Sequence, residues 1–250
     1  MSGPLISVQG LAVGFGGQPL LEGIGFEVEQ GQVLVIIGES GCGKTLLLKN
    51  MIGLYRPLAG RVLIAGTDLA ASEGDQRRAV QRKFGVAYQS GALFGSMSLL
   101  DNVRLPLEEY TRLDDAAIEL VARLKLSQVG LLGSEAKMPA ELSGGMQKRA
   151  AIARAMALDP AILFLDEPSA GLDPVTAAGI DQLILQLSDA QGITFVVVTH
   201  ELASIFAIAD RAVMLDREAR GIIAAGKPED LRDHSPHPRV ARFFHREAAP

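Results

Sequence analysis

Apolar and polar positions divide the chain into short apolar runs and longer stretches of helical character. Apolar runs without polar alternation are typical of strands buried on both faces of a parallel sheet. We expect such strands at residues 33–37, 84–89, 161–165 and 193–198. The intervening stretches predict helices at residues 46–51, 72–83, 143–157, 176–187 and 202–209. Alternating strands and helices predict an α/β fold with a mostly parallel sheet covered on both faces.

The N-terminal part has a different pattern. Residues 5–32 alternate apolar and polar positions in short runs broken by glycine, with an expected turn at 14–17. Together with a hairpin strand at 61–66, they predict an antiparallel β layer. Near the other end of the chain, residues 212–215 and 221–224 predict a terminal β pair around a charged turn.

Residues 97–140 show no strand pattern and predict a helical insertion. Amphipathic helices are expected at 99–110 and 114–126, with a kink or break at Pro106. We therefore divide the chain into a core with its β layer, an inserted helical subdomain and a tail, at residues 1–96 with 159–234, 97–158, and 235–250. The tail is expected to be solvated and partly frayed, with His234, His237 and His245 exposed rather than bound to metal.

Composition excludes several classes of protein. Of the 250 residues 48% are hydrophobic, which is enough for a large core. The net charge of −5 and the absence of a basic run argue against a nucleic-acid partner. The single cysteine, Cys42, allows no internal disulfide and fits a reducing compartment. Neither a secretory signal nor a membrane-length apolar stretch is visible, so work at a membrane would need a membrane-spanning partner.

One stretch predicts a phosphate-binding loop. It follows the apolar run 33–37, precedes a helix, and reads G-x-x-x-x-G-K-T: Gly38, Glu39, Ser40, Gly41, Cys42, Gly43, Lys44 and Thr45. Its glycines allow a concave nest of backbone N–H donors, and the helix N-terminus adds more donors. Lys44 can then reach the β- and γ-phosphates of ATP, and the Thr45 hydroxyl can bind Mg²⁺.

A pair of carboxylates ends the apolar run 161–165. A strand of this kind beside the phosphate-binding strand would place Asp166 near the Mg²⁺ ion. Glu167 could then polarise the attacking water as a general base. Alone, an acidic pair at a strand end is more often a solvated edge or a helix cap. The preceding phosphate loop makes the chemical interpretation the stronger one.

Ser143, Gly144 and Gly145 open a helix and form a second candidate anion site. Ser143 can cap the helix, and the glycines leave backbone N–H groups accessible. An ordinary N-cap is the simpler alternative. The longer string 142–147, Leu-Ser-Gly-Gly-Met-Gln, resembles the signature motif of ATP-binding cassette (ABC) proteins.

The companion motifs of that family are present in the expected order. Phe15 resembles the aromatic residue that stacks on adenine, Gln89 the Q-loop glutamine, Asp173 the end of the D-loop, and His200 the switch histidine. Residues 38–45 and 162–167 match the Walker A and Walker B motifs. Serine or glycine is more usual at Cys42 and tyrosine at Phe15, and we expect both replacements to preserve activity.

The resemblance implies a P-loop ATPase with a RecA-like core, an antiparallel β layer and an inserted helical subdomain. It implies that two chains form a homodimer and hold two ATP molecules between them, each closed by the partner's Ser143, Gly144 and Gly145. Lys44, Gln89, Glu167 and His200 would be catalytic, with Thr45, Gln89 and Asp166 as Mg²⁺ ligands. Asp173 would belong to the nucleotide-binding set.

Residues 89–107 and 138–146 resemble the ATPases of Mla/MCE-type lipid transporters, as does the tail at 238–244. The resemblance implies phospholipid transport between bacterial inner and outer membranes, with a membrane permease and a periplasmic MCE protein as partners. The chain would then lie peripherally on the cytoplasmic face of the inner membrane. A transporter subunit for another small substrate stays open. A soluble ABC ATPase acting on nucleic acid is disfavoured, because the chain has one cassette and no sustained heptads.

Overall fold

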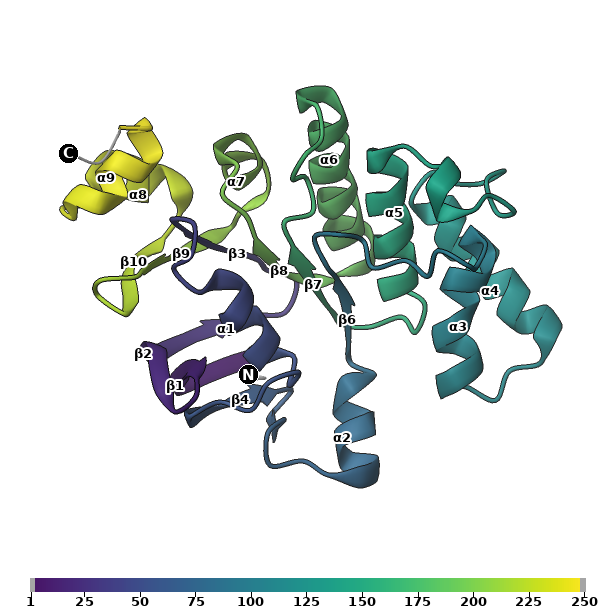
Figure 1. Cartoon of the computed structure of the whole chain (residues 1–250), viewed down its shortest axis with the longest axis horizontal. Helices are drawn as coiled ribbons and strands as arrows, with labels where there is room; N and C mark the ends of the chain where they lie inside the picture. Colours follow the sequence, from purple (N-terminus) through teal and green to yellow (C-terminus); the bar gives the residue numbers. More distant parts are fainter. Residues whose placement is uncertain (1–2, 248–250) are drawn as a thin grey trace.

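The structure, a computed structural model, describes residues 3–247. A six-stranded sheet with strand order β10-β9-β3-β8-β7-β6 forms its centre (Figure 1). All neighbouring strands are parallel except β10, which pairs with β9 in the antiparallel direction. Their bounds are β3 Val33–Gly38, β6 Phe84–Ala87, β7 Ile162–Asp166, β8 Thr194–Val198, β9 Arg211–Asp216 and β10 Gly221–Gly226. The predicted parallel sheet and terminal β pair are confirmed.

The central strand β3 is buried on both faces, as its unbroken apolar run predicts. Val33, Val35 and Ile37 belong to one core cluster. Leu34 and Ile36 belong to the other, because successive side chains of a strand point to opposite faces. The two clusters lie on either side of the sheet. Because neighbouring strands are parallel, the loops at their carboxyl ends lie along one rim of the sheet.

A second sheet covers one face of the first. It has four antiparallel strands in the order β2-β1-β4-β5, and α1 packs between the two sheets (Figure 1). The bounds are β1 Ile6–Phe15, β2 Gln18–Val28, β4 Ala59–Ile64, β5 Thr67–Asp68 and α1 Lys44–Met51. The antiparallel layer predicted for the N-terminal part is therefore confirmed.

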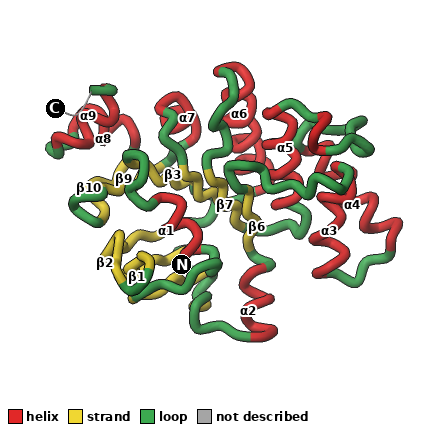
Figure 2. Tube along the Cα trace, viewed as in Figure 1, coloured by secondary structure: helices red, strands yellow, loops and turns green. Residues whose placement is uncertain are grey.

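Helices cover the opposite face (Figure 2). Here α5, α6 and α7 pack on the sheet, and α3 and α4 extend from α5. The bounds of the helices outside the tail are α2 Gly74–Gln81, α3 Leu99–Tyr110, α4 Asp115–Gln128, η1 Pro139–Glu141, α5 Gly144–Ala155, α6 Pro174–Gln191 and α7 Leu202–Ile208. The inserted helices are confirmed, whereas the domain boundaries stay predictions. No helix within residues 3–247 has the length and apolar character to span a membrane.

Of the expected kink or break at Pro106, the break is wrong, because α3 continues through the proline. A proline inside a helix removes one hydrogen bond and costs about 3 kcal/mol. Burial of Leu99, Val103 and Leu107 along one face of α3 opposes that cost. A capping box between Ser98 and the third helical residue further stabilises the start of the helix.

The expectation of a frayed tail is also wrong. After α8 Pro228–His234, the tail itself forms α9 Pro238–His245, which packs on the core through Val240 and Phe244. Phe244 meets Phe206 of α7 with ring centroids 5.7 Å apart. The spacing of the two buried residues, four positions apart, is the helical signal that an interpretation as solvated tail overlooks.

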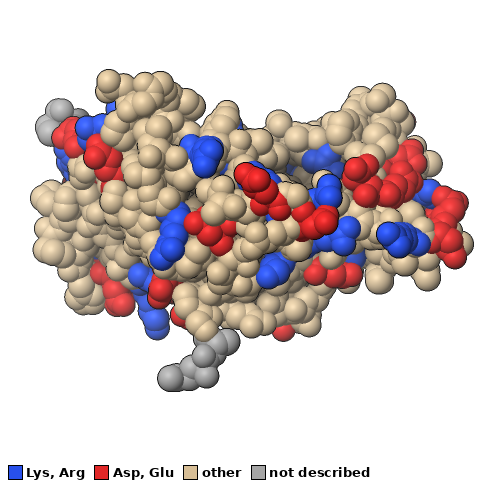
Figure 3. Space-filling view, turned by 90° about the horizontal axis from the view of Figure 1, so that it is seen from below, with Lys and Arg blue, Asp and Glu red and all other residues tan. Residues whose placement is uncertain are grey.

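On the face seen in Figure 3, acidic and basic side chains are intermixed.

Candidate functional site

The loop between β3 and α1 has the backbone that the phosphate-loop motif predicts. Gly38, Gly41 and Gly43 all have positive φ angles, of 146°, 78° and 102°. A Cβ atom on Gly38 would lie 2.5 Å from the Leu215 carbonyl oxygen, so this position also needs glycine for space. Lys44 is buried, and its Nζ donates to the carbonyl oxygens of Gly38 at 2.7 Å and Glu39 at 3.0 Å. These bonds hold the ammonium group over the nest.

A cavity of about 620 Å³ opens at this loop. It brings together residues that are far apart in sequence, because the loops after β3, β6, β7 and β8 meet at one rim of the sheet. Besides the P-loop, the predicted residues Gln89, Glu167 and His200 line it. Leu20 of β2 and Phe243 of α9 also line it, and sequence analysis assigned neither to the site.

Thr45 and Asp166 form the predicted Mg²⁺ position. The Thr45 Oγ1 donates to Asp166 Oδ1 at 3.1 Å, and Asp166 lies at the end of β7. Burial raises the pKa of Asp166, partly opposed by the hydrogen bond from Thr45. A divalent cation would stabilise this desolvated carboxylate, and hydroxyl and carboxylate oxygens are the hard ligands that Mg²⁺ prefers. The residues present therefore fit the ion.

Glu167 and His200 form a pair beside the cavity. The Glu167 Oε1 lies 2.8 Å from His200 Nδ1, and the Glu167 residue is only 7% exposed. Its other oxygen, Oε2, is buried and has no hydrogen-bond partner among the described residues. Glu167 has φ of 50°, an unfavourable value for a residue with a side chain. The contact with the histidine therefore holds the carboxylate of Glu167 at the wall of the cavity.

The predicted second anion site lies outside this cavity. Ser143 caps α5, and its Oγ accepts a hydrogen bond from the Met146 N–H at 3.3 Å. Ser143 and Gly144 are exposed, whereas Gly145 is buried against α6. Asp173 is likewise exposed and caps α6, where hydrogen bonds from Thr176 lower its carboxyl pKa. None of these four residues lines the nucleotide cavity of their own chain.

The predicted adenine-stacking residue also lies outside the cavity, at the tip of the β1–β2 hairpin. The expected turn at 14–17 is shorter than predicted, because Phe15 still pairs with Gln18 and only Gly16 and Gly17 form the turn. The Phe15 side chain is 64% exposed and meets the edge of Tyr55 at 6.2 Å between ring centroids. It therefore presents an open ring beside the P-loop helix.

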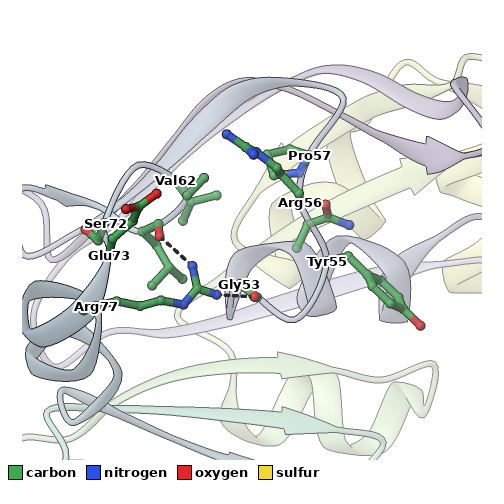
Figure 4. A pocket seen from close by; sticks show the side chains of 12 residues that line it. Gly53, Tyr55, Arg56, Pro57, Val62, Ser72, Glu73 and Arg77 are labelled. Carbon is green, nitrogen blue, oxygen red and sulfur yellow. Dashed lines mark hydrogen bonds between the residues drawn. The ribbon is translucent and has the colours of Figure 1, made fainter.

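A second pocket, of about 340 Å³, has Tyr55 and Arg77 among its lining residues (Figure 4). Arg77 crosses it and donates to the Gly53 carbonyl at 2.7 Å and the Leu69 carbonyl at 3.3 Å. None of the predicted site residues lines this pocket. The hydrogen bonds of Arg77 tie α2 to the end of α1 and to the antiparallel layer.

The fold and the site define a P-loop ATPase. A glycine nest lies at the N-terminus of α1, and two carboxylates, Asp166 and Glu167, lie at the end of β7. The family model described as ABC transporter matches residues 21–170, and the chain belongs to this family.

Known proteins of this family cover nearly the whole chain. It is 40% identical over 242 residues to the probable ribonucleotide transport ATP-binding protein mkl of Mycobacterium leprae, covering 97% of this chain and 69% of that protein. It is 38% identical over 248 residues to the intermembrane phospholipid transport system ATP-binding protein MlaF of Haemophilus influenzae, covering 99% and 93%. Among solved structures, the dimeric post-hydrolysis ATP-binding cassette MJ0796 with ADP and Pi matches with a TM-score of 0.80 and 28% identity, covering 89% and 98%.

Proposed function

We propose that this ABC ATPase drives phospholipid transport between the inner and outer membranes of a bacterium. The observation that carries the proposal is the match to MlaF, which extends over 99% of this chain and 93% of that protein. The mkl protein is named for ribonucleotide transport and extends well beyond the match. A transporter for a different small substrate is therefore the second candidate.

The active unit that we propose is a homodimer. Each chain holds its signature residues Ser143 and Gly144 exposed and away from its own nucleotide cavity. Bringing two such chains together around a two-fold axis would place each signature helix on the nucleotide of the partner. The likeness to a dimeric cassette with bound ADP and Pi supports this arrangement.

Hydrolysis would proceed by in-line attack of water on the γ-phosphate. The backbone N–H groups of the P-loop and Lys44 bind the phosphates, and the partner's Ser143 closes the site. Thr45, Asp166 and Gln89 would hold Mg²⁺, which neutralises charge on the phosphate oxygens when bound. Glu167 takes a proton from the water, and His200 orients it through the 2.8 Å contact.

We propose that the segment after Gln89 receives the permease. Arg154 of α5 donates to the carbonyl oxygens of Gly91 at 3.1 Å and Ala92 at 2.8 Å, and its guanidinium lies 5.8 Å from the Phe94 ring. The fully buried Asn102 fixes the same segment through a bond from the Phe94 N–H to its Oδ1 at 2.8 Å. The Phe94 side chain nevertheless stays half exposed. This anchored, protruding ring suits an apolar partner helix.

A groove of about 320 Å³ beside this segment supports the assignment of this surface to the permease. It lies between β6 and the inserted helices and is lined by Phe84, Pro106, Tyr110 and Arg154, among others. A membrane permease seated there would keep the chain on the cytoplasmic face of the inner membrane. A periplasmic MCE-type protein would complete the transporter, and no nucleic acid is involved.

The test is to purify the tagged chain from detergent-solubilised membranes and identify its stoichiometric partners. The proposal predicts a permease together with an MCE-type protein, and ATP-dependent transfer of phospholipid by the reconstituted complex. A permease with a periplasmic solute-binding protein, and no lipid transfer, would favour the second candidate. Recovery of the chain without any membrane subunit would contradict both.

A further inference from the structure

Lys148 joins three parts of the site that sequence analysis treats separately. It lies on α5, close behind the signature residues, and its side chain is partly buried. Its Nζ donates to the carbonyl oxygen of Gln89 and, at 3.0 Å, to the carbonyl oxygen of Glu167. Lys148 does not line the cavity at the P-loop of its own chain.

The backbone conformation of Glu167 has to be held in place by its neighbours. Glu167 has a positive φ, and such a conformation persists only where the surroundings impose it. On one side, its N–H donates to the Val198 carbonyl at 2.8 Å, which ties it to β8. On the other side, its carbonyl accepts from the Ala170 N–H at 3.3 Å and from the Lys148 side chain at 3.0 Å. These bonds restrain the backbone on both sides of the Glu167 side chain, which lies 2.8 Å from His200 Nδ1.

We propose that Lys148 is a positioning residue, which holds the backbone of Glu167 in its catalytic orientation and links that orientation to the position of the Gln89 loop. The proposal rests on the proposed role of Glu167 as general base. Because the segment after Gln89 is the one that we assign to the permease, a shift of that segment would act on Glu167 through a single ammonium group. The inserted helices therefore contribute to hydrolysis in their own chain as well as through Ser143 in the partner.

The experiment compares three variants of the full chain. Lys148→Met keeps the aliphatic stem and removes all donors, whereas Lys148→Arg keeps donors that can reach both carbonyls. Lys137→Met is the matched control, since Lys137 is an exposed lysine in the inserted helical region. A misplacement of about 1 Å can cost a hundredfold in rate, so we expect Lys148→Met to lower kcat about tenfold or more. KM for ATP should stay within about twofold, because the P-loop contacts are untouched.

Each result supports or overturns the proposal. Lys148→Arg should recover most of kcat, and adding Lys148→Met to a Glu167→Gln chain should cause little further loss, since the two residues act as one unit. A kcat of Lys148→Met within about twofold of wild type, or a parallel rise in KM and fall in kcat, would overturn it. If Lys148→Met does not fold, Lys148→Gln takes its place, with the same KM criterion. Failure of the Glu167→Gln test itself would instead refute the general-base assignment.

Discussion

Replacing Glu167 by glutamine should separate ATP binding from hydrolysis. The amide has the same shape and can keep the 2.8 Å contact with His200, but it cannot take a proton from water. General bases contribute about 10²–10⁴-fold to rate, which corresponds to roughly 3–5 kcal/mol on the barrier at 1.36 kcal/mol per factor of ten. The buried Oε2 has no partner among the described residues, so removing the charge should not lower stability.

The assay measures phosphate release by Glu167→Gln together with ATP affinity and melting temperature. We expect kcat to fall at least about a hundredfold, with ATP still bound and the dimer stabilised by unhydrolysed nucleotide. Glu201→Gln is the matched control, because Glu201 Oε1 lies 3.7 Å from the other nitrogen of His200 and its side chain is about half exposed. Turnover of Glu167→Gln near the wild-type rate would refute the reasoning, as would an equal loss in the control.

Two further predictions concern packing and charge. A Cβ atom on Gly145 would lie 2.4 Å from Thr176 Cγ2, so Gly145→Ala should cost about 1–3 kcal/mol of unfolding free energy. Thr176→Ser removes that methyl group and should restore most of the loss in a chemical denaturation series. Burial would raise the pKa of Asp216, but bonds from the Ala219 N–H and Arg239 place it below its ordinary value of 3.8. A carboxyl group whose pKa is lower in the folded state than in the unfolded state stabilises the protein at a pH above the unfolded-state pKa. This stabilisation is lost as the pH falls through the folded-state pKa. Arg239→Met should therefore lower the melting temperature at pH 7, and a difference that persists undiminished below the Asp216 pKa would contradict this.

The sequence predicts those parts of the site in which the functional residues and the loop or strand that positions them lie in one short stretch of chain. Gly38 to Thr45 must form a nest because three glycines precede a helix, and an apolar strand must end at Asp166. These features need only the few residues around them, so position and geometry follow from the motif. The common rim also follows from the pattern, because parallel strands joined by helices place their carboxyl ends at the same edge of the sheet. The strand order does not follow: β8 lies between β3 and β7, so the strand that ends at Asp166 is not the neighbour of the phosphate-binding strand.

The remaining contacts depend on tertiary packing. Phe243 reaches the cavity at the P-loop because α9 packs against α7, whereas the sequence indicates a solvated, partly frayed tail. Lys148 contacts Glu167 because the inserted helices return to the sheet at α5. Pro106 shows the same limit, since burial on three neighbouring turns overrides a local preference for a break. Local spacing can indicate the helices themselves, but the partners that they contact are not encoded in a short window of sequence.

The composite nucleotide site is tested most directly by mixing two inactive chains. Ser143→Arg should block closure on the partner's nucleotide, and Lys44→Ala should prevent productive phosphate binding in its own cavity. Each homodimer should be inactive, whereas an equal mixture contains heterodimers with one intact site and should recover at most about a quarter of wild-type turnover. Full activity of Ser143→Arg alone, or no recovery on mixing, would show that each chain completes its own site and would contradict the account.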